Sequence, residues 1–300
     1  MALLPGCDAV GLRAIERLST QNAGTTTFLE LFAPQPPPEV RADCSDWYSN
    51  NLCLLAAEQK LAAAIEEQTP DLLFLQEIWH QPDCEEAGRP AELNAAPYVC
   101  AAGSDLQIQR LLPDGYRFGC AGEYPDNCIA FRDRVFEPDG GSCDDDCSAL
   151  LVSNPAACGR DGRLASIRGR IASGHAIFVV VHTNAGVGEE AEDCRAAQLE
   201  AIQQALASEP ASTAIFMAGD FNFDPEFYDG ADAQALAHMV AALGLTRLPV
   251  DGYTHLISMM QLDQLYTRGW PSAPSVSCLP RFLDESEDEA NFDHAFVSCR

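Results

Sequence analysis

The sequence predicts an α/β protein, folded as a single domain over residues 1–300. Short apolar runs that are typical of buried strands alternate with segments in which alanine, leucine and isoleucine recur at helical spacing. Of the 300 residues, 47% are hydrophobic, which is ample for the core of one large fold with two sheets. The sequence shows no internal repeat and no linker long enough to separate two domains.

The first half of the chain contains one long helix pattern and three strand patterns. A helix is predicted for residues 52–68, and strands are predicted for residues 17–22, 72–75 and 127–131. The helix ends at Thr69-Pro70-Asp71, because proline cannot continue it. A proline-rich loop at residues 34–38 and a stretch of loop and short helix at residues 81–126 complete this half.

The second half repeats the alternation of strands and helices. Strands are predicted for residues 176–181, 212–217, 262–266 and 294–298, and helices for residues 192–207 and 232–243. The aspartate cluster between Cys143 and Cys147 and the acidic run at residues 284–289 are typical of solvated loops.

The charge of the chain limits its partners. The formal net charge is -27, and Lys60 is the only lysine. Such a surface repels polyanions, so nucleic acid is a less natural substrate here than for a basic protein, although a local arginine cluster or bound cations would weaken this objection. No run of about 18 apolar residues occurs, so we expect no membrane span.

The thirteen cysteines indicate an oxidising compartment, because their spacing does not match a paired zinc motif. Four pairs lie near one another in loop-like regions: Cys44 and Cys53, Cys84 and Cys100, Cys120 and Cys128, and Cys143 and Cys147. The sequence alone does not determine the connectivity. We expect a secreted, extracellular or periplasmic protein that is monomeric, and Leu3-Leu4-Pro5-Gly6-Cys7 allows a lipid anchor on Cys7 as an alternative to an ordinary disulfide.

Polar side chains stand at the ends of the predicted strands. Asp220 and Asn222 follow the apolar run 212–217, and alternation along a strand would point both to the same side. Their oxygen atoms suit a divalent cation or a phosphate, and Gly219 would allow close approach. The full set of such residues is Asn22, Glu77, His182, Asp220, Asn222, Asp263, Asp293 and His294.

Each of these residues also has a purely structural explanation. Glu77 and Asp293 are also typical of capping positions, and His182 and His294 of hydrogen-bonded histidines in a core. Their recurrence at one strand end after another favours a shared site for phosphate chemistry, and we expect all eight groups to meet at one edge of the fold.

In this order the residues resemble the endonuclease/exonuclease/phosphatase superfamily, which includes deoxyribonuclease I and bacterial sphingomyelinases. The matching segments are Gln21-Asn22, Pro70 to Glu77, Val181 to Asn184, Gly219 to Asn222, Leu262 to Leu265 and Asp293-His294. The resemblance implies a four-layer sandwich with two mixed β-sheets packed face to face and helices outside. The helix segment Cys194 to Leu199 also looks like the helix that follows the histidine strand in bacterial sphingomyelinases, although a plain amphipathic helix explains it equally.

The resemblance also implies roles for the eight residues. Glu77 and Asp293 would hold Mg²⁺, or Mn²⁺ or Ca²⁺ in its place. Asn22, Asn222 and His182 would bind the substrate phosphate. The catalytic set would comprise His182, Asp220, Asn222, Asp263 and His294, with Asp263 fixing the tautomer of His294.

Three functions remain open at this point. The first is a secreted phosphodiesterase acting on a phospholipid headgroup or another small phosphodiester, in the manner of a sphingomyelinase. The second is a secreted nuclease similar to deoxyribonuclease I, which the negative charge opposes. The third is a catalytically inactive binding module, which is disfavoured because every expected catalytic position is filled.

Overall fold

The structure is a computed structural model of the chain. It describes residues 11–24, 51–79, 84, 94–103, 105–121, 126–140, 149–150, 155, 158, 163–256, 258–270, 276–283, 292 and 294–300. The predicted loops at residues 34–38, 143–147 and 284–289 lie outside these ranges, as do Cys7 and Asp293.

One of the two sheets has six strands in the order β12-β13-β1-β2-β4-β3. The strands are β1 (Leu18–Asn22), β2 (Leu72–Gln76), β3 (Tyr116–Cys120), β4 (Cys128–Arg132), β12 (Cys278–Arg281) and β13 (Phe296–Cys299). β1 and β2 run parallel, and the other neighbouring pairs are antiparallel.

The other sheet has seven strands, six of them in the order β10-β11-β9-β8-β7-β5, with β6 also paired to β7. The strands are β5 (Glu137–Pro138), β6 (Ala149–Leu150), β7 (Arg163–Ile171), β8 (Gly174–His182), β9 (Ala214–Asp220), β10 (Thr246–Arg247) and β11 (Asp263–Arg268). β8 and β9 run parallel, and the remaining pairs are antiparallel.

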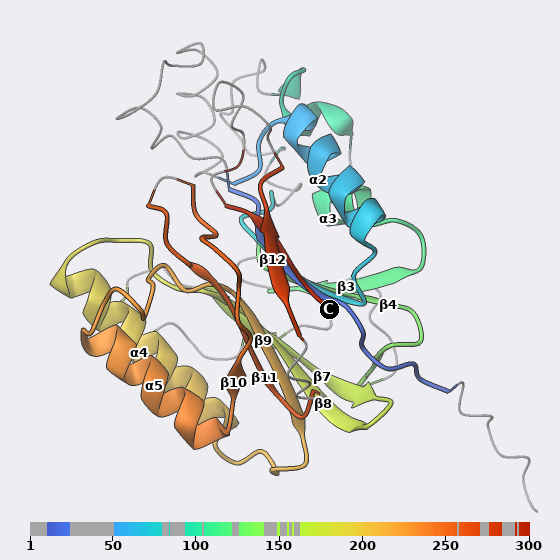
Figure 1. Cartoon of the computed structure of the whole chain (residues 1–300). Coiled ribbons are helices and arrows are strands. Elements are labelled where there is room, and N and C mark those ends of the chain that lie inside the picture. Colours follow the sequence, from blue (N-terminus) through green and yellow to red (C-terminus); the bar gives the residue numbers. More distant parts are fainter. Residues whose placement is uncertain are drawn as a thin grey trace, which may run out of the picture.

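Helices cover the outer faces of both sheets (Figure 1). On the six-stranded sheet lie α2 (Leu55–Gln68) and α3 (Gln107–Leu111), and on the seven-stranded sheet lie α4 (Glu189–Leu206) and α5 (Ala231–Leu243). The short 3₁₀ helix η4 (Val99–Ala102) lies beside α2. The predicted four-layer sandwich is therefore confirmed. Among the described helices, none combines the length and apolar character needed to cross a bilayer.

The apolar core lies between the sheets and continues under the helices. On β8, Phe178 and Val180 pack toward the other sheet, whereas Val179 and Val181 pack toward α4 and α5. Because both faces are covered, β8 is an almost continuous apolar run rather than an alternating one. Phe178 lies opposite Phe216 on β9, and their rings meet edge to face with centroids 5.5 Å apart.

The predicted helices and all seven predicted strands are present, but three longer strands were missed. β3 lies at a sheet edge, and its side chains are mostly half-buried, so it lacks the apolar run of a central strand. β7 is interrupted by Arg168 and Arg170, which point to solvent. β12 also lies at an edge and contains Pro280, which is tolerated there because an edge strand leaves some N–H groups unpaired.

Disulfides join neighbouring strands and loops. Cys84–Cys100 and Cys120–Cys128 match two of the neighbouring pairs noted in the sequence, and Cys120–Cys128 links β3 to β4. Cys158–Cys194 and Cys278–Cys299 were not anticipated, and the latter links β12 to β13. Cys53 is also disulfide-bonded.

The side chain of Tyr116 yields a prediction about alkaline stability. Its hydroxyl donates to the carbonyl of Pro70, and burial raises the pKa of Tyr116 to about 12. Between pH 10 and 12 the folded protein therefore keeps a proton that the unfolded chain has lost, so stability falls as the pH rises through this window. Tyr116→Phe should cost about 1 kcal/mol at pH 7 through the lost hydrogen bond.

The loss in Tyr116→Phe should shrink at higher pH, because the variant no longer carries the titrating group. Urea unfolding of both proteins at pH 7 and at pH 10.5 measures this difference. An equal stability deficit at both pH values would contradict the assignment.

Candidate active site

The strand directions bring distant polar residues to one edge of the sandwich. Asn22 ends β1 and Glu77 follows the parallel strand β2, so the two are neighbours. His182 and Asp220 end the parallel strands β8 and β9 and lie opposite each other in register. β11 runs antiparallel to β9, and its first residue, Asp263, therefore lies opposite Asp220. The edge thus collects side chains from both sheets.

Asn22 connects the two sheets through its side-chain amide. Its Nδ2 donates to Asp220 Oδ2 at 3.0 Å and to Glu77 Oε1 at 3.2 Å. His182 Nε2 lies 3.1 Å from the same Glu77 oxygen. Asn22 and Asp220 are almost fully buried, so these polar groups depend on one another for hydrogen bonds.

His294 and Asp263 form a buried pair beside Asp220. His294 Nδ1 lies 2.7 Å from Asp263 Oδ2, and His294 Nε2 lies 3.6 Å from Asp220 Oδ2. A carboxylate facing Nδ1 favours the tautomer with its proton on that nitrogen, which leaves Nε2 facing Asp220 as the acceptor. The backbone of His294 is held by Gln21, whose Nε2 donates to the His294 carbonyl at 3.2 Å.

The environment of Asp220 changes its proton affinity. Burial raises the pKa of Asp220 above its ordinary value; His294 and His182 oppose this shift, and the nearby carboxylate of Asp263 adds to it. A carboxyl group with raised pKa is a better proton acceptor than an exposed one. Asp220 and His294 together can therefore exchange a proton with a bound water.

Asn222 is placed differently from the sequence expectation. β9 ends at Asp220, so strand alternation does not extend to Asn222, which has a left-handed backbone with φ of 55°. Its N–H donates to Asp220 Oδ1 at 2.7 Å, and its Nδ2 donates to the carbonyl of Thr183 at 2.9 Å. Asn222 thus ties together the loops that follow β8 and β9.

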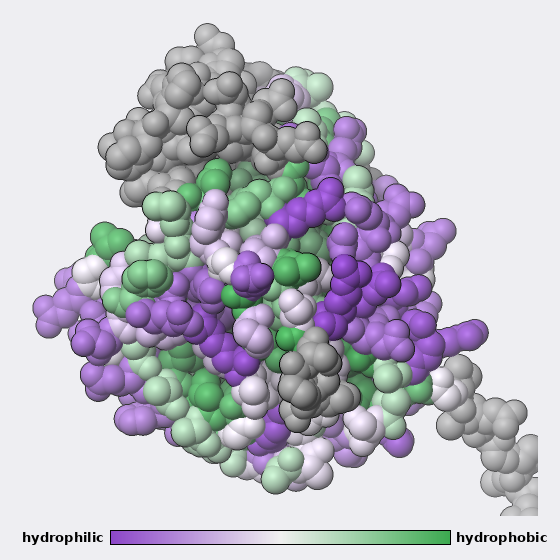
Figure 2. Space-filling model, viewed as in Figure 1, coloured by the Kyte–Doolittle hydropathy of each residue, from purple (hydrophilic) through white to green (hydrophobic). Residues whose placement is uncertain are grey.

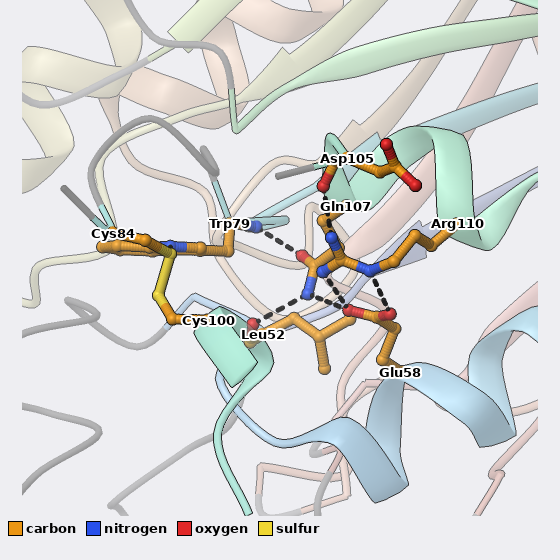
Figure 3. The surroundings of a disulfide bond; sticks show 8 residues. All are labelled: Leu52, Glu58, Trp79, Cys84, Cys100, Asp105, Gln107 and Arg110. Carbon is orange, nitrogen blue, oxygen red and sulfur yellow. Dashed lines mark hydrogen bonds and ion pairs between the residues drawn. A yellow bond between two sulfur atoms is a disulfide. The ribbon is translucent and has the colours of Figure 1, made fainter. Parts of the chain in front are cut away.

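The turn that carries Glu77 is held by residues that the sequence did not single out (Figure 3). Glu77 itself has a left-handed backbone with φ of 55°, and the N–H of Leu52 donates to its carbonyl at 2.7 Å. Gln107 joins the next part of the turn: its Oε1 accepts from the N–H of Trp79 at 2.5 Å, and its Nε2 donates to Leu52 O at 3.1 Å and Glu58 Oε2 at 2.9 Å. These bonds fix a strained backbone.

An ion pair and a disulfide surround this Gln107 network. Arg110 contacts both carboxylate oxygens of Glu58, at 2.7 and 2.8 Å, which orients the carboxylate that Gln107 binds. On the other side, Trp79 Nε1 lies 3.1 Å from the Sγ of Cys84, which is bonded to Cys100 (Figure 3). Spacing along the chain gave no signal for this arrangement, because the partners come from separate loops.

Arg195 and Gln198 on α4 support the loop that follows His182. Arg195 forms a buried ion pair with Asp232 of α5, Nε to Oδ2 at 2.8 Å, and also donates to the carbonyl of Gly186 at 2.7 Å. Gln198 Oε1 accepts from the N–H of Asn184 at 3.1 Å. Both residues belong to the segment Cys194 to Leu199 that looked like a sphingomyelinase helix, and both have a structural use here.

Among the described residues, Glu77 supplies a carboxylate that could ligate a divalent cation. In the described ranges no cluster of three or more histidine, cysteine or acidic residues could cage a metal. Mg²⁺ does not require such a cage, since one or two carboxylates usually suffice. Glu77 Oε1 accepts from Asn22 and contacts His182, and a Cβ on Gly24 would lie 1.9 Å from Oε2, so only glycine at this position admits the carboxylate.

Gly219 provides a stability test of the close approach between β8 and β9. Its φ is 144°, and a Cβ there would lie 1.9 Å from the carbonyl oxygen of Val181. Gly219→Ala should therefore destabilise the protein by more than about 2 kcal/mol, from backbone strain and collision together. Urea unfolding measures the loss.

Gly174→Ala is the matched control for this substitution. Gly174 lies on the neighbouring strand with a similar φ of 136°, but a Cβ there meets nothing within 4 Å. Gly174→Ala should therefore lower the free energy of unfolding only through the unfavourable backbone conformation. Equal losses for the two variants would show that contact with Val181 is unimportant.

A second stability test concerns Gln107. Gln107→Leu leaves the N–H of Trp79, the carbonyl of Leu52 and one oxygen of Glu58 without this partner in a buried place, and should cost about 3 kcal/mol or more. Gln109→Leu on the exposed side of α3 is the control and should cost less than about 1 kcal/mol. A loss for Gln107→Leu no larger than that of the control would mean that the network adds little.

Comparison with solved structures shows the same fold in several enzymes. TDP2 of D. rerio, solved with a single-strand DNA product, has a TM-score of 0.56 at 15% identity, and the match covers 94% of this chain and 97% of that chain. The human Nocturnin catalytic domain has a TM-score of 0.56 at 17% identity, covering 97% and 95%. A mannosyl-6-phosphatase of Bacteroides thetaiotaomicron has a TM-score of 0.54 at 13% identity, covering 95% and 98%.

At these identities the structural matches show the fold alone. The search of curated proteins finds no match. The family model described as the Endonuclease/Exonuclease/phosphatase family matches residues 49–298, which is most of the chain. The protein with this polar edge between two sheets therefore belongs to the endonuclease/exonuclease/phosphatase family.

Proposed function

We propose that the protein is a metal-dependent hydrolase of phosphodiesters. The observation that carries the proposal is the single network in which Asn22, Glu77 and His182 meet Asp220, Asp263 and His294 at one edge of the sandwich. Membership of the family supports the same reading. A purely structural network would not need two histidines, three carboxylates and an amide in contact at a partly open edge.

The residues can supply the groups that phosphodiester hydrolysis requires. Asp220 and His294 orient the attacking water and accept its proton, and Asp263 keeps His294 in the tautomer that can do so. Asn22 and Asn222 would hold phosphate oxygens by exchanging bonds that their amides now make to Asp220, Glu77 and the carbonyl of Thr183. His182 either binds a non-bridging oxygen or protonates the leaving oxygen, and its contact with Glu77 suits either role.

Glu77, with Asp293 as the second expected ligand, would hold the metal ion. Mg²⁺ is the first choice, with Mn²⁺ or Ca²⁺ as alternatives, because all three prefer carboxylate oxygens. When bound, such an ion neutralises charge on the phosphate and stabilises the leaving oxygen. The turn held by Gln107 would then fix the orientation of Glu77.

The substrate we favour is a small phosphodiester or a phospholipid headgroup. The net charge of -27 opposes binding to a long polyanion, and the disulfides favour a secreted or periplasmic protein. A nuclease is the alternative, supported by the DNA-bound TDP2 structure among the structural matches. We further propose a monomer.

Two substitutions test the catalytic assignment. His294→Ala and Asp220→Ala should each lower kcat at least about a hundredfold, because groups that orient and deprotonate the nucleophile contribute on that scale. Hydrolysis of bis-p-nitrophenyl phosphate with Mg²⁺ measures the effect, with plasmid DNA, RNA and sphingomyelin vesicles as parallel substrates.

His175→Ala is the matched control, since His175 is exposed at the opposite end of β8 from His182. It should retain normal turnover. Near-normal kcat in His294→Ala would contradict the assignment. No turnover of any substrate by the wild-type protein, with metal bound, would favour a binding module instead.

A further inference from the structure

Exposed apolar side chains lie on loops that are connected to residues of the candidate active site. In the described part of the chain six large hydrophobic side chains are exposed to solvent: Val187, Phe227, Tyr228, Tyr253, Met259 and Leu279. Val187 is 98% exposed, Phe227 69% and Met259 67%. Five of the six, all except Leu279, lie on three loops, at residues 183–188, 221–230 and 248–262. We call these five residues the apolar rim.

Each of the three loops is attached directly to a residue of the site. Loop 183–188 follows His182, loop 221–230 follows Asp220, and loop 248–262 leads into Asp263. The apolar rim therefore lies on the loops that extend from the polar network. In Figure 2, green and pale green atoms lie over the upper left part of the described surface, where Figure 1 places the loops above β9 and β11.

Hydrogen bonds and ion pairs hold the three loops together. Asp224 is buried, and its Oδ2 accepts from the N–H of Gln261 at 2.9 Å, which joins loop 221–230 to loop 248–262. Arg195 contacts both the carbonyl of Gly186 and the carboxylate of Asp232, which joins loop 183–188 to the start of α5, just after loop 221–230. The rim is thus one supported surface.

The charges beside the rim indicate what it can contact. Its neighbours include five exposed carboxylates: Glu189, Glu190, Glu226, Asp229 and Asp251. Glu226 is paired with Arg247 at 3.2 Å. Together with the net charge of -27, these groups repel nucleic acid and anionic bilayers. They attract the cationic end of a zwitterionic headgroup, and aromatic faces such as those of Phe227 and Tyr228 bind quaternary ammonium groups.

We propose that the apolar rim docks the protein onto a zwitterionic phospholipid bilayer. Apolar and aromatic side chains would enter the headgroup region, as they do in proteins that lie on membranes. The site from which these loops extend would then face the phosphodiester of the headgroup. The inference names a substrate class for the proposed hydrolase and rests on that function only in this last step.

Sedimentation with phosphatidylcholine vesicles tests the docking. The full disulfide-bonded chain should bind these vesicles, and the double variant Phe227→Ser with Met259→Ser should bind at least about tenfold more weakly, because the buried apolar area is reduced. Adding phosphatidylserine to the vesicles should weaken binding of the wild type at least about threefold through charge repulsion. Val187→Asp is a second, independent variant and should weaken binding as well.

Ala172→Asp is the matched control for Val187→Asp, since Ala172 is exposed in the turn between β7 and β8, at the opposite end of β8 from His182. It should bind phosphatidylcholine vesicles like the wild type. The thermal unfolding midpoint of each variant shows that the fold is retained.

Three outcomes would overturn the proposal. These are no binding of the wild type to phosphatidylcholine vesicles, tighter binding to vesicles containing phosphatidylserine or to DNA, and concentration-dependent self-association that the double variant abolishes. The last result would make the rim an interface between two copies of the chain. Wild-type turnover of bis-p-nitrophenyl phosphate is measured separately, so failure of docking and failure of the proposed hydrolase activity are distinguished.

Discussion

The amide of Asn22 is the contact on which the geometry of the site depends. It donates to Glu77 from its own sheet and to Asp220 from the other sheet, and so fixes the separation between two carboxylates that would otherwise repel each other. An amide is suited to this place because it neutralises neither carboxylate and adds no buried charge. The two-sheet architecture is required because no single sheet supplies all the partners.

The residues around the site mainly preserve this geometry. Glu77 and Asn222 have left-handed backbones, which are unfavourable for residues other than glycine. Their neighbours compensate: Gln107 and Leu52 hold the turn after β2, and Thr183 holds Asn222. Many of the hydrogen bonds around the candidate site therefore serve to fix the conformation of its loops.

The sequence predicted the helices, the central strands and the polar residues at the strand ends because these follow from local patterns, and the family resemblance implied the two-sheet sandwich. β8 and β9 are apolar runs followed by polar residues, and parallel pairing brings their ends together. The sequence did not predict β7, because its exposed arginines interrupt the apolar pattern of a strand. It also did not predict the position of Asn222, because the residue at which β9 ends depends on the loop that follows. The network of Gln107 was unpredictable because it joins segments far apart in the chain.

The roles assigned to the site residues depend on chemistry that sequence order alone does not specify. His182 and His294 are both histidines at strand ends, yet one faces Glu77 and the other is paired with Asp263. Only the three-dimensional arrangement shows that Asp263 holds the imidazole of His294 in one tautomer, whereas the imidazole of His182 lies beside the partly exposed carboxylate of Glu77. The same arrangement shows that Arg195, which lies in the helix segment Cys194 to Leu199, holds α4 to α5 through its ion pair with Asp232.

The placement of two disulfides affects how the six-stranded sheet can open. Cys120–Cys128 and Cys278–Cys299 bind each outermost strand, β3 and β12, to the strand beside it. Edge strands are ordinarily where a sheet frays and where a foreign strand can add. Here neither margin can peel away without breaking a covalent bond, so backbone amides in β3 and β12 should exchange hydrogen slowly for strands in such marginal positions.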